Sequence, residues 1–171
     1  MLNEFVGDLV IASRAMGWLD ARALQSKVSH EFKVTVHRMC IWHLVATLSK
    51  WQEVYDCYHE LFPKDVREAS RELRKELERR GVRDFRNTVV GHILDKKTKK
   101  PMTKADIDKK LSKIFNGDYE GFLLGVNTPG GNDFPKTVVS IVEQIGDRLT
   151  QEHSITPEEL FPWKHHDKVG V

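Results

Sequence analysis

The run from Glu31 to Phe62 limits the possible folds of this chain more than any other stretch. Its apolar and aromatic residues recur at intervals of three, four and seven, the spacing that places side chains on one face of an α-helix. Pro63 ends the pattern, because proline cannot continue a helix. A helix of this length spans about 45 Å and needs a partner along most of it, either other helices of a bundle or a second subunit.

Helical patterns also occupy the flanking regions. Residues 3–28 predict an amphipathic helix or a helix pair, with Gly17 as a candidate break. Residues 65–80 predict a surface helix with a narrow apolar stripe, and Gly81 closes it. A further helix is expected to begin near Asp84.

The C-terminal half is also largely helical in pattern. Thr103 and Asp106 resemble a capping box that begins a helix over residues 104–115. The segment from there to Pro135 is the least helical in pattern, and Pro135 is placed to open another helix. Thr156 marks a last helical start. We therefore expect an all-α fold, with an up-and-down core of four or five helices and a short C-terminal helix.

The chain length and amino-acid composition predict one soluble domain over residues 1–171, with residues 152–171 as a less ordered tail. Cys40 and Cys57 lie in one predicted helix, so neither a disulfide framework nor a zinc site is expected. No run approaches the roughly 18 apolar residues of a membrane span, and the N-terminus does not resemble a signal peptide. We expect a cytoplasmic protein with no membrane contact and no cofactor or metal.

The charges are distributed unevenly along the chain. Residues 64–110 hold sixteen Lys and Arg against nine Asp and Glu, whereas the remaining residues hold eleven against sixteen. An anionic partner would explain this segregation. Alternating charges on a solvated helix face would explain much of it equally well.

The stretch from Asp84 to His92 combines residue types suited to phosphate chemistry. Arg86 supplies a permanent cation, Asn87 an amide, and His92 a group that gains or loses a proton near neutral pH. On a regular helix, Arg86 and His92 would lie about 240° apart around the axis and ~9 Å apart along it. One small ligand therefore meets both only if the helix is distorted near Gly91, or if two copies of the chain meet face to face. A run of lysines follows, at Lys96, Lys97, Lys99 and Lys100.

This pattern resembles the R-x4-6-H motif of the HEPN superfamily. In those all-α bundles the arginine is followed by a polar residue, commonly Asn, Asp or His, as Arg86 is followed here by Asn87. Phe85 matches the apolar residue before the arginine, and Gly91 matches the small residue before the histidine. The motif is closest to the abortive-infection and toxin-like branch, and the rest of the chain agrees in its helical layout.

The resemblance implies a metal-independent endoribonuclease of toxin or phage-defence type, acting as a homodimer with both motifs in one cleft. His92 would be the general acid and base, acting on the ribose 2′-hydroxyl or the leaving oxygen and leaving a 2′,3′-cyclic phosphate. Arg86 would bind the scissile phosphate of the RNA, and Asn87 would orient the histidine or the phosphate. Basic side chains would hold the flanking phosphates, namely Arg83, Lys96, Lys97, Lys99 and Lys100.

Other interpretations of the same residues remain open. In one branch of the superfamily the motif continues His-x-Tyr, and a partner antitoxin nucleotidylates the tyrosine. Leu94 occupies that position here, which leaves a protein antitoxin of another kind, or none. The alternative function is a non-catalytic helical module that binds nucleic acid, a nucleotide or a protein partner. In a purely structural interpretation, Arg86 is a surface residue in an ion pair and His92 is a partly buried histidine.

Overall fold

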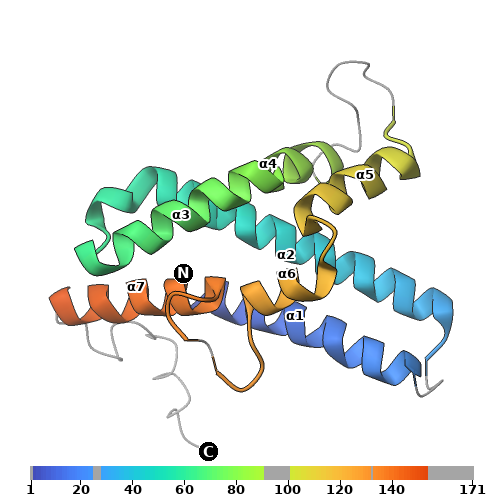
Figure 1. The fold of residues 1–171 in the computed structure, drawn as a ribbon, viewed down its shortest axis with the longest axis horizontal. Coiled ribbons are helices and arrows are strands. Elements are labelled where there is room, and N and C mark those ends of the chain that lie inside the picture. The colour runs from blue at the N-terminus through green and yellow to red at the C-terminus, as the bar shows by residue number, and fades with distance from the viewer. Residues whose placement is uncertain (1, 25–27, 91–100, 132, 154–171) are drawn as a thin grey trace, which may run out of the picture.

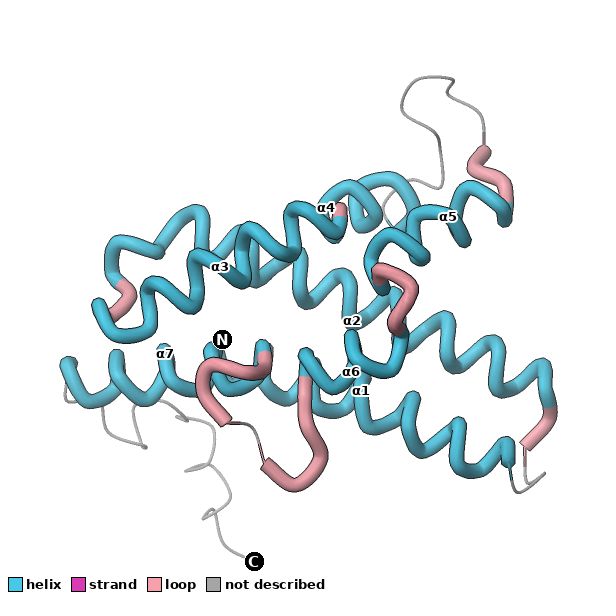
Figure 2. Tube along the Cα trace, in the orientation of Figure 1, coloured by secondary structure: helices cyan, strands magenta, loops and turns pink. Residues whose placement is uncertain are grey.

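The computed structural model describes residues 2–24, 28–90, 101–131 and 133–153. These residues form an all-α structure of seven α-helices, one 3-10 turn and one π-helical turn, without a β-strand among them (Figures 1 and 2). The elements in chain order are α1 (Leu2–Leu24), α2 (His30–Tyr58), η1 (His59–Leu61), α3 (Lys64–Arg80), α4 (Val82–Phe85), η2 (Arg86–Val90), α5 (Lys104–Phe115), α6 (Tyr119–Val126) and α7 (Val138–His153).

The long helix α2 crosses the molecule and organises the packing. It forms a hairpin with α1, and its second half packs against α3, α4 and η2 (Figure 1). Helix α7 packs against α1 and α3, while the short α6 lies beside α1 and α7. One continuous apolar core joins these elements, and its largest fully buried side chains include Trp51, Phe85, Leu9, Met16 and Leu44. Within the described ranges the chain is therefore one packed unit.

Most of the helices expected from the sequence are present, with shifted ends. Helix α1 runs without a break through Gly17. Helix α2 begins after Ser29, whose hydroxyl accepts a hydrogen bond from the Phe32 backbone N–H, and it tightens into the 3-10 turn η1 before Pro63. Helix α5 begins at the predicted capping box. The left-handed Gly81, with φ of 76°, closes α3 as expected.

Two expectations about the remaining helices were wrong. The segment before Pro135 contains α6, because Asp118 caps its N-terminus through the Gly121 backbone N–H at 2.8 Å, and because its buried residue Phe122 packs on Phe115. Helix α7 begins at Val138 rather than at Pro135. The helical start expected at Thr156 and most of the tail, residues 154–171, lie outside the described residues.

None of the described helices combines the length and apolar character that crossing a lipid bilayer requires.

Candidate functional site

The short helix α4 and the turn η2 hold the predicted site residues against α2. Val82, Phe85 and Val89 are buried at intervals of three and four, so this face of the segment faces the core. The intervening residues Arg83 and Arg86 are consequently directed outward. The core thus fixes the position of the site through three apolar anchors.

The helix is distorted directly after Phe85. Residues Arg86–Val90 form a π-helical turn, in which each backbone hydrogen bond spans one residue more than in an α-helix. The Thr88 hydroxyl of this turn donates a hydrogen bond to the Asp84 carbonyl oxygen of α4 at 2.7 Å. The π-helical turn extends to Val90, the last described residue before Gly91. Such turns recur at functional sites in other proteins.

Arg86 is held by two neighbours. Its Nη1 donates a hydrogen bond to Asn87 Oδ1 at 3.0 Å and lies 3.8 Å from Glu53 Oε1 on α2. The Arg86 side chain is 40% exposed. A guanidinium has five N–H donors, so contacts through a single nitrogen leave donors for an anionic oxygen. Arg86 is thus a loosely paired cation at the surface, as the structural interpretation expects, and it is still able to bind a phosphate.

Asp56 organises the arginines beside this site. Its Oδ2 accepts a hydrogen bond from Arg83 Nη2 at 2.7 Å, and its Oδ1 accepts one from Arg74 Nε at 3.0 Å. Partial burial opposes ionisation of Asp56, but the hydrogen bonds from Arg83 and Arg74 outweigh it and lower the carboxyl pKa below 3.8. Arg83, expected to bind RNA, is therefore committed in part to a protein carboxylate.

A hollow of about 290 Å³ lies between α2, α3 and α4, next to Arg86. Asn87, which accepts the hydrogen bond from Arg86, lines this hollow. Gln52 on α2 forms another part of its wall. Gln52 is 1% exposed, and its Oε1 has no hydrogen-bond partner within the described part of the chain. The remaining lining residues are Arg74, Glu78, Gly81, Arg83 and Asp84.

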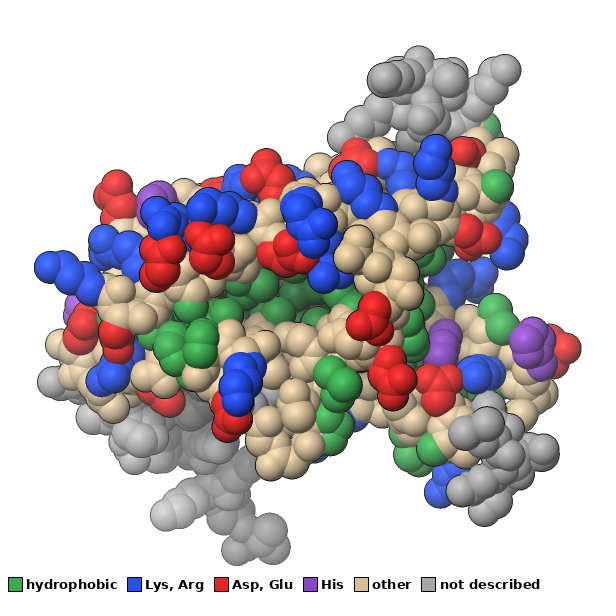
Figure 3. All heavy atoms as spheres, viewed as in Figure 1, with side chains coloured by type: hydrophobic (Ala, Val, Ile, Leu, Met, Phe, Trp, Pro, Cys, Tyr) green, Lys and Arg blue, Asp and Glu red, His purple; other side chains and the backbone are tan. Residues whose placement is uncertain are grey.

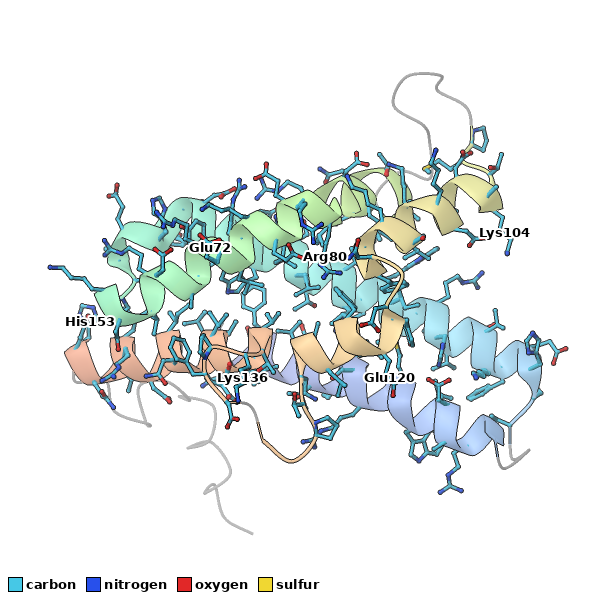
Figure 4. All side chains as sticks on the ribbon, viewed as in Figure 1. Glu72, Arg80, Lys104, Glu120, Lys136 and His153 are labelled. Carbon is cyan, nitrogen blue, oxygen red and sulfur yellow. The ribbon has the colours of Figure 1, made fainter. Side chains whose placement is uncertain are left out.

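A larger depression of about 640 Å³ lies elsewhere, between α3 and the α6–α7 side of the molecule. Hydrophobic side chains form its floor (Figure 3), and Glu72, Arg80 and Lys136 lie at its rim (Figure 4). Neither Arg86 nor Asn87 lines it. Size alone does not identify the site here, because Arg83 and Asn87 line the smaller hollow and Asn87 also contacts Arg86.

The basic excess of the central region is largely paired along α3. Arg71 binds Glu68, Lys75 binds Glu72, and Arg79 and Arg80 both bind Glu76. The hydrogen bond from Arg79, with that from Arg80, lowers the pKa of Glu76 to about 2 against the opposing effect of partial burial. On this helix, alternating charges on a solvated face account for the pattern, and α3 offers little unpaired positive charge.

The structure brings together Arg83, Arg86 and Asn87 of the predicted site. His92 and the lysines at 96, 97, 99 and 100 lie outside the described residues, as do Gly91 and Leu94. Sequence reasoning missed Gln52, Glu53 and Asp56, which α2 brings to the site. Gln52 carried a usable signal, because it directly follows Trp51 of the apolar stripe and therefore lies close to the face that is expected to be buried. Glu53 and Asp56 gave none, since charged residues on a long helix are ordinary.

Together, the fold and the site define an all-α protein with an arginine–amide pair on a distorted helix. The fold is similar to that of a solved structure from the mobile metagenome of V. paracholerae, the integron cassette protein Vpc_cass2. The TM-score is 0.74 at 20% sequence identity, covering 87% of this chain and 91% of that chain. At this identity the likeness concerns the fold alone. No family profile and no curated protein matches the sequence.

Proposed function

We propose that this protein is a metal-independent endoribonuclease of toxin or phage-defence type, and that two copies form one cleavage cleft. The observation that carries the proposal is the pair of Arg86 and Asn87 at the start of the π-helical turn. The pair is held outward by buried neighbours on either side, and the turn leads directly to Gly91 and His92. This arrangement agrees with the HEPN-like motif of the sequence.

The chemistry of RNA cleavage explains why these residue types are needed. Attack by the ribose 2′-hydroxyl on the adjacent phosphate requires a base with a pKa near neutral, and a donor that stabilises the charge growing on the phosphate oxygens. His92 would move the proton, and the Arg86 guanidinium would bind the phosphate. Asn87 would hold Arg86 in the geometry that its Oδ1 contact already provides.

A non-catalytic binding module is the second candidate, and one observation favours it. Within the described part of the site, the ionisable neighbours are held in ion pairs. Asp56 binds Arg74 and Arg83, and Lys110 binds Asp84. Groups held in this way would position a ligand through charge and hydrogen bonds. A role limited to binding nucleic acid, a nucleotide or a protein partner would need only this part of the site.

The decisive experiment is cleavage of a labelled RNA pool in EDTA by wild type, Arg86→Ala and His92→Ala. We expect wild type to leave 2′,3′-cyclic phosphate ends. His92→Ala should lower the rate by roughly 100-fold to 10,000-fold, the usual contribution of a general acid–base group. Arg86→Ala should lower it by roughly 100-fold to 1,000-fold, because a charge-stabilising donor is lost.

Matched variants separate the site from general effects of charge. Arg71→Ala removes an exposed arginine that is paired with Glu68 on α3, and His153→Ala removes an exposed histidine at the end of α7. Both should cleave at the wild-type rate. Absence of cleavage by the folded wild type between about pH 6 and 9 would contradict the nuclease proposal. RNA binding by both wild type and His92→Ala, with no cleavage by either protein, would support the second candidate.

A further inference from the structure

We infer that the hollow beside Arg86 binds a nucleobase, and that Gln52 reads its edge. This inference rests on the proposed function, because it assigns to the hollow the base of the nucleotide next to the scissile phosphate. It goes further by naming the part of the substrate that determines sequence preference and the residue that recognises it.

The first argument is the amide oxygen of Gln52, which is buried without a hydrogen-bond partner in the described ranges. The residue is 1% exposed, yet its Oε1 has no partner among the residues that the structure describes, and neighbouring Arg83 Nε is likewise buried without one. A buried polar group without a hydrogen bond destabilises the fold, because it loses its contacts with water and gains none in return. A leucine would fill the same place in the core without this cost. An amide kept here at the wall of a hollow therefore points to a ligand that completes its hydrogen bonds.

The second argument is the balance of charge in the hollow. Arg74 and Arg83 contribute two positive charges, and Glu78 and Asp84 contribute two negative ones. Arg74 forms an ion pair with Glu78, and Asp84 forms one with Lys110. A phosphate would gain little from a site whose charges are already balanced, whereas a neutral polar ring would meet both donors and acceptors. The hollow therefore suits the base, and Arg86 beside it suits the phosphate.

The third argument is size and position. A volume of about 290 Å³ lies at the lower limit of ligand sites, which typically measure about 300–1,000 Å³. It therefore has room for one ring system. Asn87 lines the hollow and also contacts Arg86, so a base in the hollow and a phosphate on Arg86 would belong to the same or adjacent nucleotides.

The amide chemistry selects among the bases. A glutamine side chain presents one donor and one acceptor side by side, a pair that matches the N6 amino group and N7 of adenine. Guanidinium planes such as that of Arg83 stack on unpaired RNA bases. Adenine is consequently the base that the hollow matches best.

The first arm of the test measures binding without cleavage. Adenosine, guanosine, cytidine and uridine 5′-monophosphates are titrated into wild type, Gln52→Leu and the control Gln144→Leu, whose substitution on α7 lies outside the hollow. We expect wild type to bind adenosine monophosphate most tightly. Gln52→Leu should weaken that binding about tenfold or more, because a two-point contact to the base edge is lost. Gln144→Leu should bind as wild type does.

A thermal unfolding scan checks that Gln52→Leu folds. We expect it to be at least as stable as wild type, since leucine removes the buried amide oxygen. Equal binding of adenosine monophosphate by folded Gln52→Leu and wild type would overturn the inference, and so would wild type binding none of the four nucleotides.

The second arm maps the bases that flank the cleavage sites in an RNA pool. Enrichment of adenine beside the cuts of wild type, lost in Gln52→Leu and kept in Gln144→Leu, would support the inference. Cleavage with the same base preference in all three proteins would overturn it while leaving the nuclease proposal intact. Conversely, Gln52-dependent binding of adenosine monophosphate by a protein that cleaves no RNA would contradict the nuclease proposal and support the base site.

Discussion

The two halves of α2 share one helical pattern but differ in their surroundings. In the second half, Leu44, Leu48 and Trp51 are at most 1% exposed, because α1, α3, α4 and η2 enclose them. In the first half, Phe32 and Met39 are 51% and 63% exposed. Together with the end of α1, that half forms a hairpin tip that projects beyond the bundle (Figure 1). The enclosed half also carries Gln52, Glu53 and Asp56, so the candidate site lies where the helix is held most firmly.

This difference has a functional consequence. A binding or catalytic group must be held in place by packed neighbours, and the enclosed half of α2 has more buried residues than the tip. The exposed apolar residues of the tip stabilise the chain little, and removing them should leave the site undisturbed. Three pairs of substitutions, each with one member in the enclosed region and one in the tip, test the comparison.

The largest effect is expected from a buried aromatic residue. Trp51→Ala removes a side chain with no exposed surface and leaves a cavity in the core, which should lower the free energy of unfolding by about 3–5 kcal/mol. Phe32→Ala removes a half-exposed aromatic side chain at the tip of the same helix. This substitution should change the free energy of unfolding by less than about 0.5 kcal/mol. Urea unfolding followed by circular dichroism measures both. Similar losses for the two variants would show that the tip is buried in solution, for example by a second copy of the chain.

The same helix shows how much of the fold could be predicted from its sequence. Periodicity identified the face of Leu48, Trp51 and Tyr55, and all three are buried. Val34 belongs to the same periodic stripe, yet it is 50% exposed. Periodicity shows which residues share a face, but it does not show how far along the helix its neighbours extend. That limit depends on the lengths and crossing points of the other helices, which no local pattern contains.

Local chemistry was predictable where the residues themselves determine the backbone. The capping box of Thr103 and Asp106 and the closure of α3 at Gly81 both depend on neighbouring residues alone, and both are present. Helix α6 was missed because its two glycines, Gly121 and Gly125, weaken the helical signal, and the packing of Phe122 compensates only in the folded chain.

The candidate site was predictable only in part. The residues that one segment contributes, Arg86 and Asn87, could be read as a motif, and the structure places them in contact. The contributions of α2 depend on a helix crossing more than thirty residues away in the chain, so Gln52 and Glu53 could not be assigned to Arg86 from the sequence. The residues that α2 contributes to the site can therefore be assigned only from the tertiary structure.

The second pair of substitutions replaces one glycine in each region with alanine. Gly81 links α3 to α4 with φ of 76°, a conformation in which a side chain costs roughly 1–2 kcal/mol. Gly81→Ala should lower the free energy of unfolding by about that amount and shift the α4 segment that carries Arg86. Gly17→Ala lies inside α1 toward the tip, where an added methyl group meets no atom within 4 Å among the described residues. It should raise the free energy of unfolding by about 0.5–1 kcal/mol, since alanine favours the helix. Opposite signs in a thermal or urea unfolding experiment are the expected result, and a stabilising Gly81→Ala would contradict the left-handed turn.

The smallest effects are expected from two aspartates, each with two basic partners. In the enclosed region Asp56 binds the guanidiniums of Arg74 and Arg83, whereas at the tip Asp20 lies 2.9 Å from Lys33 Nζ and 3.4 Å from His37 Nε2. Asp56→Asn should cost about 1 kcal/mol near pH 7, a modest value because solvent reaches about a third of the carboxylate side chain. Asp20→Asn should change the free energy of unfolding by less than about 0.5 kcal/mol.

The effect at Asp56 should also depend on pH, in a direction that follows from its pKa. Against opposing partial burial, the hydrogen bonds of Arg83 and Arg74 lower the carboxyl pKa in the folded protein below its ordinary value of 3.8. The ionised carboxylate therefore stabilises the fold fully above that value, and this stabilisation is lost as the pH falls through the lowered pKa. Urea unfolding of wild type and Asp56→Asn at about pH 7, 5 and 3 should show a constant difference at the two higher values and a smaller one at the lowest. A difference that stays the same at about pH 3 would mean that Asp56 acts through packing rather than charge, and the two aspartates would then differ only in their degree of burial.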